Sequence, residues 1–216
     1  MPIYVLDERI IFPPPRKADP SGIVAVGGDL SIERLLLAYR SGIFPWYSKG
    51  EPLIWWSPDP RFVLFPDELK VPTSLKRIIK SGKFRVTFDQ NFRDVIASCG
   101  AIKRKHEDGT WITPEMIEAY CALHKAGHAH SVEVWLGDEL AGGLYGVSVG
   151  RCFCGESMFT KFSNASKVAL VALVERLKTR GCEMIDSQVH TDHLARMGAR
   201  EISRTEYLRR LRLALR

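Results

Sequence analysis

The sequence predicts an α+β protein, in which a mixed sheet is flanked by helices and follows a small irregular N-terminal domain. In the middle of the chain helical patterns alternate with antiparallel strand patterns, and a strand–helix–strand order comes after them. The first sixty residues differ, because they are rich in proline, glycine and aromatic side chains. A chain of 216 residues can hold one medium and one small domain, so we divide it into residues 1–61 and 62–216.

One helix is readable in the N-terminal domain. Apolar side chains recur at helical spacing from Ile32 to Tyr39, with Ser31 as a candidate N-cap and Gly42 as a candidate stop. The rest of this domain is expected to be irregular and held together by aromatic residues. Its paired glycines, Gly27-Gly28, do not match a phosphate-binding loop and indicate a turn instead.

The larger domain has more regular patterns. Thr113-Pro114 is typical of a helix start, and the run 166–180 is apolar nearly all round until Glu175, which predicts a buried helix. The strand after that helix should be central. Before residue 128 we expect a short helix capped at residue 73 or 74 that buries Leu75, Ile78 and Ile79, a strand over 84–88, a helix capped by Asp89, and a helix from 114 to the glycine at 127. A hairpin of strands 131–136 and 139–149 follows, then a strand over 151–159, a helix over 166–180 and a strand over 183–189. The chain closes with a short helix from 191 toward 198 and a last helix with a capping box at 203 and 206.

Composition is ordinary for a globular protein, with 45% apolar and 26% charged residues. The net charge of +6 fits an anionic partner such as nucleic acid but does not require one. No apolar run approaches the roughly 20 residues of a membrane span. The first residues contain no basic-then-apolar signal, so we expect a cytoplasmic protein without membrane contact. The five cysteines have irregular spacing and are expected to be free and packed.

Three polar residues are the strongest candidates for chemistry. Glu156 follows Gly155 where a strand pattern ends. Asp186 and Gln188 lie two residues apart on the expected central strand, so their side chains should point the same way. Buried acids are rare unless they are paired. The residues alone leave two interpretations equally open: a polar catalytic cluster in an apolar setting, or a structural hydrogen-bond network.

No metal and no cofactor are expected. The histidines do not have the spacing of a structural zinc site, although His128 and His130 alternate at the entry to a strand. Gly142-Gly143 precedes no lysine–serine helix start and matches no dinucleotide fingerprint. A β-bulge is the simpler explanation for these two glycines.

Cationic and aromatic side chains gather in separate places. Lys76, Arg77 and Lys80 lie on the face of their helix opposite its apolar side chains, and a second basic run covers residues 103–105. A solvated face is the usual explanation for such charges, but phosphate contacts need the same arrangement. The aromatic side chains of the first half, Trp46 among them, could form a small core or could stack on unpaired bases.

Several longer motifs are spread along nearly the whole chain. They are GGDLSIERLLLAYRSGIFPWYS (27–48), WWSPDPR (55–61), GTWIT (109–113), GHAHSVEVW (127–135), FCGESMF (153–159), NASK (164–167), IDSQV (185–189) and DHLARMGA (192–199). Together these motifs resemble the leucyl/phenylalanyl-tRNA–protein transferases. Members of that family transfer Leu, Phe or sometimes Met from a charged tRNA to the α-amine of a protein that begins with Lys or Arg, which marks the protein for bacterial N-end rule degradation.

The resemblance implies a fold and partners. The larger domain of the family is similar to the N-acetyltransferase superfamily, whose members usually bind coenzyme A through a glycine-rich loop. The corresponding segment 160–167 contains no glycine, which argues for another acyl donor. The implied partners are aminoacyl-tRNA charged with Leu or Phe and proteins with N-terminal Lys or Arg. We expect the enzyme to act as a monomer without a cofactor.

The resemblance also implies roles for individual residues. Asp186 and Gln188 match the proposed catalytic pair, in which Asp186 polarises and orients Gln188 while the Gln188 carbonyl accepts a hydrogen bond from the attacking amine. Glu156 lies beside them and could pair with the basic first residue of the acceptor. The other implied sites are the aminoacyl-adenosine site with Trp46, Tyr39, Trp111 and Tyr120, the amino-acid pocket with Leu144, Phe153, Leu170, Leu173, Leu177 and Ile185, and the tRNA-backbone contact with Lys76, Arg77 and Lys80.

Three positions depart from some relatives. Leu173 and Leu177 stand where others have aromatic residues, and Thr191 replaces an amide. The first departure leaves the preference among Leu, Phe and Met open, because one or two methylenes are worth only about 1–3 kcal/mol. Two functions from other classes remain as alternatives: a coenzyme A-dependent N-acetyltransferase, and a non-catalytic RNA-binding module in which the polar cluster only braces the core.

Overall fold

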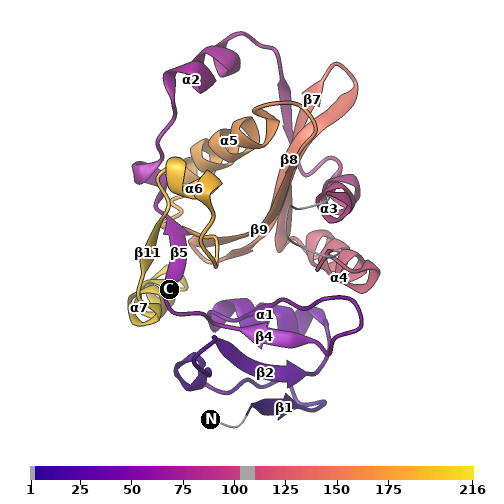
Figure 1. Cartoon of the computed structure of the whole chain (residues 1–216), viewed down its shortest axis with the longest axis vertical. Coiled ribbons are helices and arrows are strands. Elements are labelled where there is room, and N and C mark those ends of the chain that lie inside the picture. Colours follow the sequence, from indigo (N-terminus) through magenta and orange to yellow (C-terminus); the bar gives the residue numbers. More distant parts are fainter. Residues whose placement is uncertain (1–2, 103–109) are drawn as a thin grey trace.

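The computed structural model describes residues 3–102 and 110–216, which form two β-sheets with helices packed around them (Figure 1). The strands are β1 (Tyr4–Leu6), β2 (Ile23–Gly27), β3 (Phe44–Pro45), β4 (Ile54–Trp56), β5 (Arg61–Leu64), β6 (Arg85–Phe88), β7 (Ala129–Leu136), β8 (Glu139–Val149), β9 (Cys152–Thr160), β10 (Met184–Asp186) and β11 (Arg200–Ile202). The α-helices are α1 (Ile32–Arg40), α2 (Thr73–Lys80), α3 (Phe92–Ala101), α4 (Pro114–Lys125), α5 (Ala165–Thr179), α6 (Asp192–Arg196) and α7 (Arg204–Ala214), and short 3-10 turns cover Pro15–Lys17 and Pro66–Glu68. The predicted α+β class is confirmed.

The larger sheet is mixed. It has seven strands in the order β11-β5-β10-β9-β8-β7-β6. β9 and β10 run parallel, and the other neighbouring pairs run antiparallel. A parallel pair needs a crossover connection, which α5 supplies between β9 and β10. Because β10 lies between β5 and β9, the prediction of a central strand is confirmed.

Helices cover both faces of the long strands β7 and β8 (Figure 1). α5 packs on one face, and α3 and α4 pack on the other. A Cβ atom on Gly142 would lie 2.6 Å from Ala165 of α5, whereas one on Gly143 would lie 3.4 Å from Val95 of α3. Successive strand residues face opposite sides, so each glycine gives room to one helix. The expectation of a bulge is confirmed beside Gly142, because the register of β8 against β7 shifts between Leu140 and Gly142.

Several predicted helix boundaries are confirmed, because they depend on local hydrogen bonds. The Thr113 hydroxyl accepts the Met116 N–H at 3.3 Å at the start of α4. The Ser203 hydroxyl accepts the Glu206 N–H at 3.2 Å at the start of α7. The apolar run after residue 164 forms α5, most of which is buried between the sheet and the segments around it.

The N-terminal segment is more regular than expected. Besides α1, it contains a four-stranded sheet in the order β1-β2-β4-β3. These strands are two to five residues long, too short for an alternating pattern to be recognised in the sequence. α1 lies between this sheet and the rest of the molecule (Figure 1), and its Leu35 and Tyr39 share one hydrophobic cluster with Tyr145 of β8. The larger sheet begins at Arg61, and a domain division at that residue stays a prediction.

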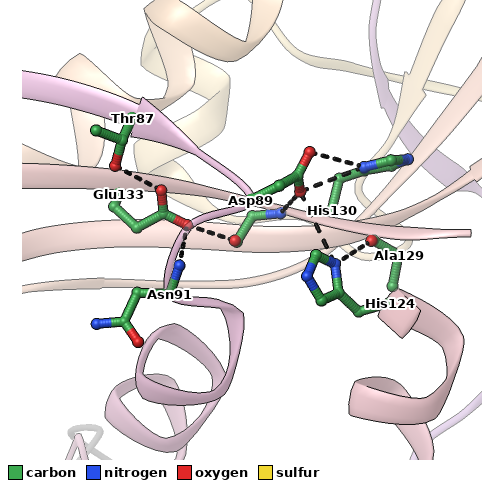
Figure 2. A network of polar contacts seen from close by, with 8 residues as sticks. Thr87, Asp89, Asn91, His124, Ala129, His130 and Glu133 are labelled. Atoms are coloured by element: carbon green, nitrogen blue, oxygen red, sulfur yellow. Dashed lines mark hydrogen bonds and ion pairs between the residues drawn. The ribbon is translucent and has the colours of Figure 1, made fainter. Parts of the chain in front are cut away.

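Asp89 does not cap α3 as expected. The N-cap is Asn91, and Asp89 adopts a left-handed backbone with φ of 60°. Its carboxylate accepts the Ser131 N–H at 3.0 Å and lies 3.1 Å from His130 Nδ1, which ties the loop before α3 to β7 (Figure 2). The fully buried Glu133 of β7 accepts the Asn91 N–H at 3.4 Å, so that carboxylate supports the helix start instead.

α2 is less buried than predicted. Leu75 is buried, but Ile79 is 40% exposed, because α2 contacts the rest of the fold mainly along α5. The helix lies at the end of the molecule opposite the small sheet (Figure 1). No helix within residues 3–102 or 110–216 combines the length and apolar character that crossing a membrane requires.

Candidate active site

A cavity of about 710 Å³ lies at the carboxyl ends of the parallel pair β9 and β10, against α5, α6 and the N-terminal segment. Its walls are of three kinds. The polar wall includes Glu156, Ser157, Ser187 and Gln188, the apolar pit is formed by Leu144, Met158, Leu170, Leu173 and Ile185, and the aromatic rim holds Phe44, Trp46 and Trp111. A cavity of this size and lining is typical of a small-molecule or cofactor site.

Glu156 reaches the cavity from β9. Its Oε2 accepts the Tyr120 hydroxyl at 3.2 Å, and its Oε1 accepts the Gln188 Nε2 hydrogen at 3.3 Å. Burial raises the pKa of the Glu156 carboxyl to about 8 and the negative charge of Asp186 adds to the rise, while hydrogen bonds from Tyr39 and Tyr120 oppose it. A carboxyl group with this pKa gains or loses a proton near neutral pH.

Gln188 reaches the cavity from the turn after β10. Its backbone is left-handed, with φ of 58°, which residues other than glycine rarely adopt. Its N–H donates to Asp186 Oδ1 at 3.1 Å, and its carbonyl accepts the Phe62 N–H at 3.1 Å. The side-chain Nε2 donates to Glu156, so the Oε1 of the amide, which no described residue contacts by a hydrogen bond, is available to a ligand.

Asp186 is fully buried and does not line the cavity. Its oxygens accept Arg61 Nε at 2.8 Å and Arg61 Nη2 at 2.7 Å, and Oδ2 also accepts the Tyr207 hydroxyl at 2.8 Å. The carboxylate therefore contacts the protein interior and the Gln188 backbone. The expectation that it polarises the Gln188 side chain is wrong, because its contact with Gln188 is through the backbone N–H.

The expectation that Asp186 and Gln188 share one face of a strand is also wrong. β10 ends at Asp186, and the left-handed turn at Gln188 redirects the chain. The Gln188 side chain consequently lines the cavity, while the Asp186 side chain lies in the core. The rule that residues two apart point the same way holds only where the chain continues as a strand.

The four aromatic residues expected at the donor site form two pairs. Trp46 and Trp111 line the cavity, and Trp46 is 37% exposed. Tyr39 and Tyr120 are buried behind the cavity wall. Their hydroxyls hydrogen-bond to each other, and Tyr120 also donates to Glu156. The two indoles are therefore accessible to a ligand, whereas the two tyrosines support the carboxyl group from behind.

Most of the expected amino-acid pocket lines the cavity, namely Leu144, Leu170, Leu173 and Ile185. Phe153 and Leu177 do not line it and belong to the hydrophobic cluster that surrounds the pit. Met158 lines the pit, although the sequence interpretation missed it. The register of β9 against β8 shifts between Gly155 and Ser157, so simple alternation from Glu156 does not indicate Met158.

The predicted tRNA contacts lie outside the cavity. Lys76, Arg77 and Lys80 are exposed on α2 and form no ion pair with the described residues. α2, which carries them, lies at the end of the fold away from the small sheet (Figure 1). The basic run 103–105 lies outside the described residues.

Within the described ranges, no group of three or more His, Cys, Asp or Glu side chains converges as metal ligands would. None of the five cysteines, all of which lie in the described ranges, forms a disulfide, and four of them are buried. The cavity lining offers a carboxyl group, an amide, several hydroxyl groups and the imidazoles of His190 and His193, among aromatic and aliphatic side chains.

Comparison with known proteins identifies the family. A sequence model described as leucyl/phenylalanyl-tRNA protein transferase matches residues 63–212, and the model of that transferase's N-terminal domain matches residues 28–59. Leucyl/phenylalanyl-tRNA–protein transferases from Syntrophobacter fumaroxidans and Flavobacterium johnsoniae are 58% and 53% identical over 96% and 95% of this chain, and over 89% and 97% of their own lengths. One from an Anaeromyxobacter species is 57% identical over 100% of this chain and 92% of its own.

The chain is thus an enzyme of the aminoacyltransferase class. It belongs to the leucyl/phenylalanyl-tRNA protein transferase family. Among solved structures, a GCN5-related N-acetyltransferase from Kribbella flavida is similar with a TM-score of 0.44 and 9% identity, over 77% of this chain and 59% of that one.

Proposed function

We propose that the protein transfers Leu, Phe or Met from a charged tRNA to the α-amine of proteins that begin with Lys or Arg, and so marks them for N-end rule degradation in the cytoplasm. The observation that carries the proposal is the contact between Glu156 and Gln188 in a cavity that also has an apolar pit and two accessible indoles. The end of an aminoacyl-tRNA has three matching parts: an apolar side chain, a flat base and a reactive ester between them.

The apolar pit accounts for the choice of donor. Its walls carry Leu, Ile and Met side chains, so a charged donor side chain would lose its hydration there without a partner. Leu, Phe and Met all lack a branch at Cβ and can extend into such a pit. Selection among these three is expected to be modest, because one or two methylenes change binding by about 1–3 kcal/mol.

The two indoles account for the adenosine. Trp46 and Trp111 offer flat surfaces at the rim, and stacking of a base on an aromatic side chain is worth about 1–3 kcal/mol. Trp46 is supported from outside the cavity, because Trp56 Nε1 donates to the Trp46 carbonyl at 2.6 Å and the two ring centroids are 5.8 Å apart. A base held at this rim would leave the ester near the polar wall.

The transfer itself forms one amide bond and breaks one ester bond. A neutral α-amine attacks the ester carbonyl carbon, the bond from that carbon to the ribose oxygen breaks, and the ribose hydroxyl leaves with the proton that the amine gives up. Gln188 Oε1 accepts a hydrogen bond from the amine and so directs its lone pair at the carbonyl carbon. An amide is not a base near pH 7, so the contribution of Gln188 is orientation.

Glu156 is suited to prepare the amine. An α-amino group has an ordinary pKa of about 7.7–8.0. The pKa of Glu156 is about 8, so its carboxylate form can take a proton from an incoming ammonium group at little cost in either direction. A Lys or Arg side chain at the first position of the acceptor would favour the same carboxylate form by its positive charge.

Lys76, Arg77 and Lys80 supply the contact with the RNA backbone. They are exposed and have no acidic partner among the described residues, so they can pair with phosphates. Each phosphate contact releases condensed counterions, which makes binding weaken steeply with salt. The cavity would bind only the aminoacyl end of the donor, so most of the RNA would lie outside it. The enzyme would act on both substrates as a monomer.

The test is a transfer assay with mass detection. The protein is incubated with charged leucyl- or phenylalanyl-tRNA and a peptide that begins with Arg. We expect the peptide to gain one Leu or Phe residue, and the same peptide with an acetylated amino terminus to gain none. If the peptide gains an acetyl group from acetyl-coenzyme A without tRNA, and no amino acid from charged tRNA, the protein is an N-acetyltransferase and the proposal is wrong.

A further inference from the structure

A buried ionic cluster lies directly behind Gln188. The Arg61 guanidinium lies between two aromatic rings, 4.8 Å from the centroid of Phe44 and 4.4 Å from that of Tyr207. Arg61 donates to both oxygens of Asp186, and the Tyr207 hydroxyl donates to one of them. Arg61, Asp186 and Tyr207 are all nearly or fully inaccessible to solvent.

We propose that Tyr207 and Arg61 are positioning residues for the transfer reaction. They fix the Asp186 carboxylate, so that its Oδ1 holds the Gln188 backbone in the conformation from which the Gln188 amide reaches Glu156. The inference rests on the function proposed above for Gln188. Neither Tyr207 nor Arg61 lines the cavity, so neither contacts substrate.

The backbone of Gln188 needs such support. At φ of 58° the Cβ atom of a glutamine is crowded by its own backbone, so this conformation is unfavourable on its own. A hydrogen bond from the Gln188 N–H to a charged oxygen is stronger than one to a neutral acceptor and offsets the cost. If Asp186 turned away, Gln188 would relax and its side chain would leave Glu156.

The cluster holds Asp186 from several directions. Oδ1 accepts Arg61 Nε at 2.8 Å and the Gln188 N–H at 3.1 Å, while Oδ2 accepts Arg61 Nη2 at 2.7 Å and the Tyr207 hydroxyl at 2.8 Å. A bidentate pair of this kind fixes the plane of the carboxylate. The rings on both sides of the guanidinium restrict its tilting. Tyr207 therefore acts twice, through its ring and through its hydroxyl.

The cluster also connects α7 with the cavity. Tyr207 lies on α7, of which no residue lines the cavity. Arg61 begins β5, and Phe44 of β3 contacts Arg61 and also lines the cavity. Tyr207 of the last helix therefore influences two parts of the site, the aromatic rim through Arg61 and Phe44, and the amide through Asp186.

The first experiment measures Tyr207→Phe in the peptide-transfer reaction. This change keeps the ring over Arg61 and removes only the hydroxyl. We expect kcat to fall roughly tenfold while KM for leucyl-tRNA stays close to the wild-type value, and the midpoint of thermal unfolding should fall by only several degrees, so that the protein remains folded in the assay. Leu211→Val, a buried change on the same helix outside the cavity lining, is the matched control and should keep the wild-type kcat.

A second set of variants separates positioning from general support of the fold. In a Gln188→Ala background, Tyr207→Phe should lower the residual rate by less than about twofold, because the amide that it positions is gone. Arg61→Lys keeps the positive charge but loses the bidentate contact, and it should show the same coupling to Gln188. A wild-type kcat in Tyr207→Phe, or a full additional tenfold loss in the Gln188→Ala background, would overturn the proposal.

A third measurement does not depend on transfer. The side-chain amide signals of Gln188 in NMR spectra should be shifted by Glu156 in the wild-type protein and in Leu211→Val. In Tyr207→Phe they should move toward the values of a free glutamine, and unchanged signals would also overturn the proposal. Absence of transfer by the wild-type protein, by contrast, would refute the proposed function. The NMR signals of Gln188 would then decide whether Tyr207 positions Gln188.

Discussion

The Gln188 side chain donates to Glu156 across 3.3 Å and so joins the turn after β10 to the neighbouring strand β9. The contact brings an acid with a pKa of about 8 next to a neutral amide in a cavity with mostly apolar walls. The amide then has a fixed direction, and the acid can change its charge near neutral pH. These two properties suit the proposed attack of an amine on an ester.

Replacement of Glu156 by Gln should make stability less dependent on pH. The folded-state pKa of about 8 lies above the ordinary value of 4.5, so folding favours the protonated carboxyl. The wild-type protein should therefore lose stability relative to Glu156→Gln as the pH rises through that interval, by up to roughly 1.4 kcal/mol per pH unit. Urea unfolding of both proteins between pH 4 and pH 9 measures the difference. Parallel stability curves over this range would contradict the raised pKa.

Leu173→Ala should change the donor preference, and Leu177→Ala should not. Leu173 lines the pit, so its truncation gives room for a larger side chain, whereas Leu177 belongs to the cluster that surrounds the pit. We expect the ratio of kcat/KM for Phe over Leu to rise about tenfold in Leu173→Ala. Both changes remove buried methyl groups and should cost about 2–5 kcal/mol of stability. An equal shift of the ratio in both variants would mean that the pit is not the donor pocket.

Removal of the cations on α2 should weaken tRNA binding in a salt-dependent way. The triple change Lys76→Ala, Arg77→Ala and Lys80→Ala should reduce the slope of log K against log salt by about 2–3, because each lost phosphate contact contributes nearly one unit. Filter binding of leucyl-tRNA between low and moderate salt measures the slope. Arg209→Ala is a suitable control, since Arg209 is an exposed cation paired with Glu206 at 2.8 Å. A slope unchanged by the triple change would place the RNA elsewhere.

Asp89→Asn should destabilise the fold without affecting transfer. Burial raises the pKa of the Asp89 carboxyl, but hydrogen bonds from His130 and Ser131 outweigh it, so the pKa lies below its ordinary value of 3.8 (Figure 2). An acid with a lowered pKa stabilises the fold above pH 3.8, and this contribution is lost as the pH falls through the folded-state value. We expect a loss of about 1 kcal/mol at pH 7 that shrinks as the pH falls below 3.8. A constant difference across that range would disagree with this explanation.

The sequence predicts those features of the fold that depend on neighbouring residues. The start of α4 follows from Thr113, whose hydroxyl accepts the N–H of Met116 three residues later. The burial of α5 follows from its apolar composition. The short N-terminal strands were not predicted, because two to five residues give no readable alternation. The face of Gln188 was predicted wrongly, because a left-handed residue leaves no signal in strand spacing.

The sequence predicted which residues form the candidate site better than it predicted how they are arranged. The resemblance indicated Glu156 and Gln188, which the structure brings into contact. The support behind them depends on pairs that are distant in sequence: Arg61 and Asp186 are 125 residues apart, and Tyr39 and Tyr120 are 81 apart. No local pattern indicates such pairs. The place of the two tyrosines at the donor site rests on the family resemblance and stays a prediction.

The most direct test of the proposed mechanism measures binding and transfer in the same variant. Gln188→Ala and wild-type protein are compared for the dissociation constant of leucyl-tRNA and for the single-turnover rate of Leu transfer to a peptide that begins with Arg. We predict that the rate falls roughly a hundredfold while the dissociation constant changes less than about twofold. Equal losses of binding and rate, or transfer at the wild-type rate, would contradict the role of Gln188 in orienting the amine.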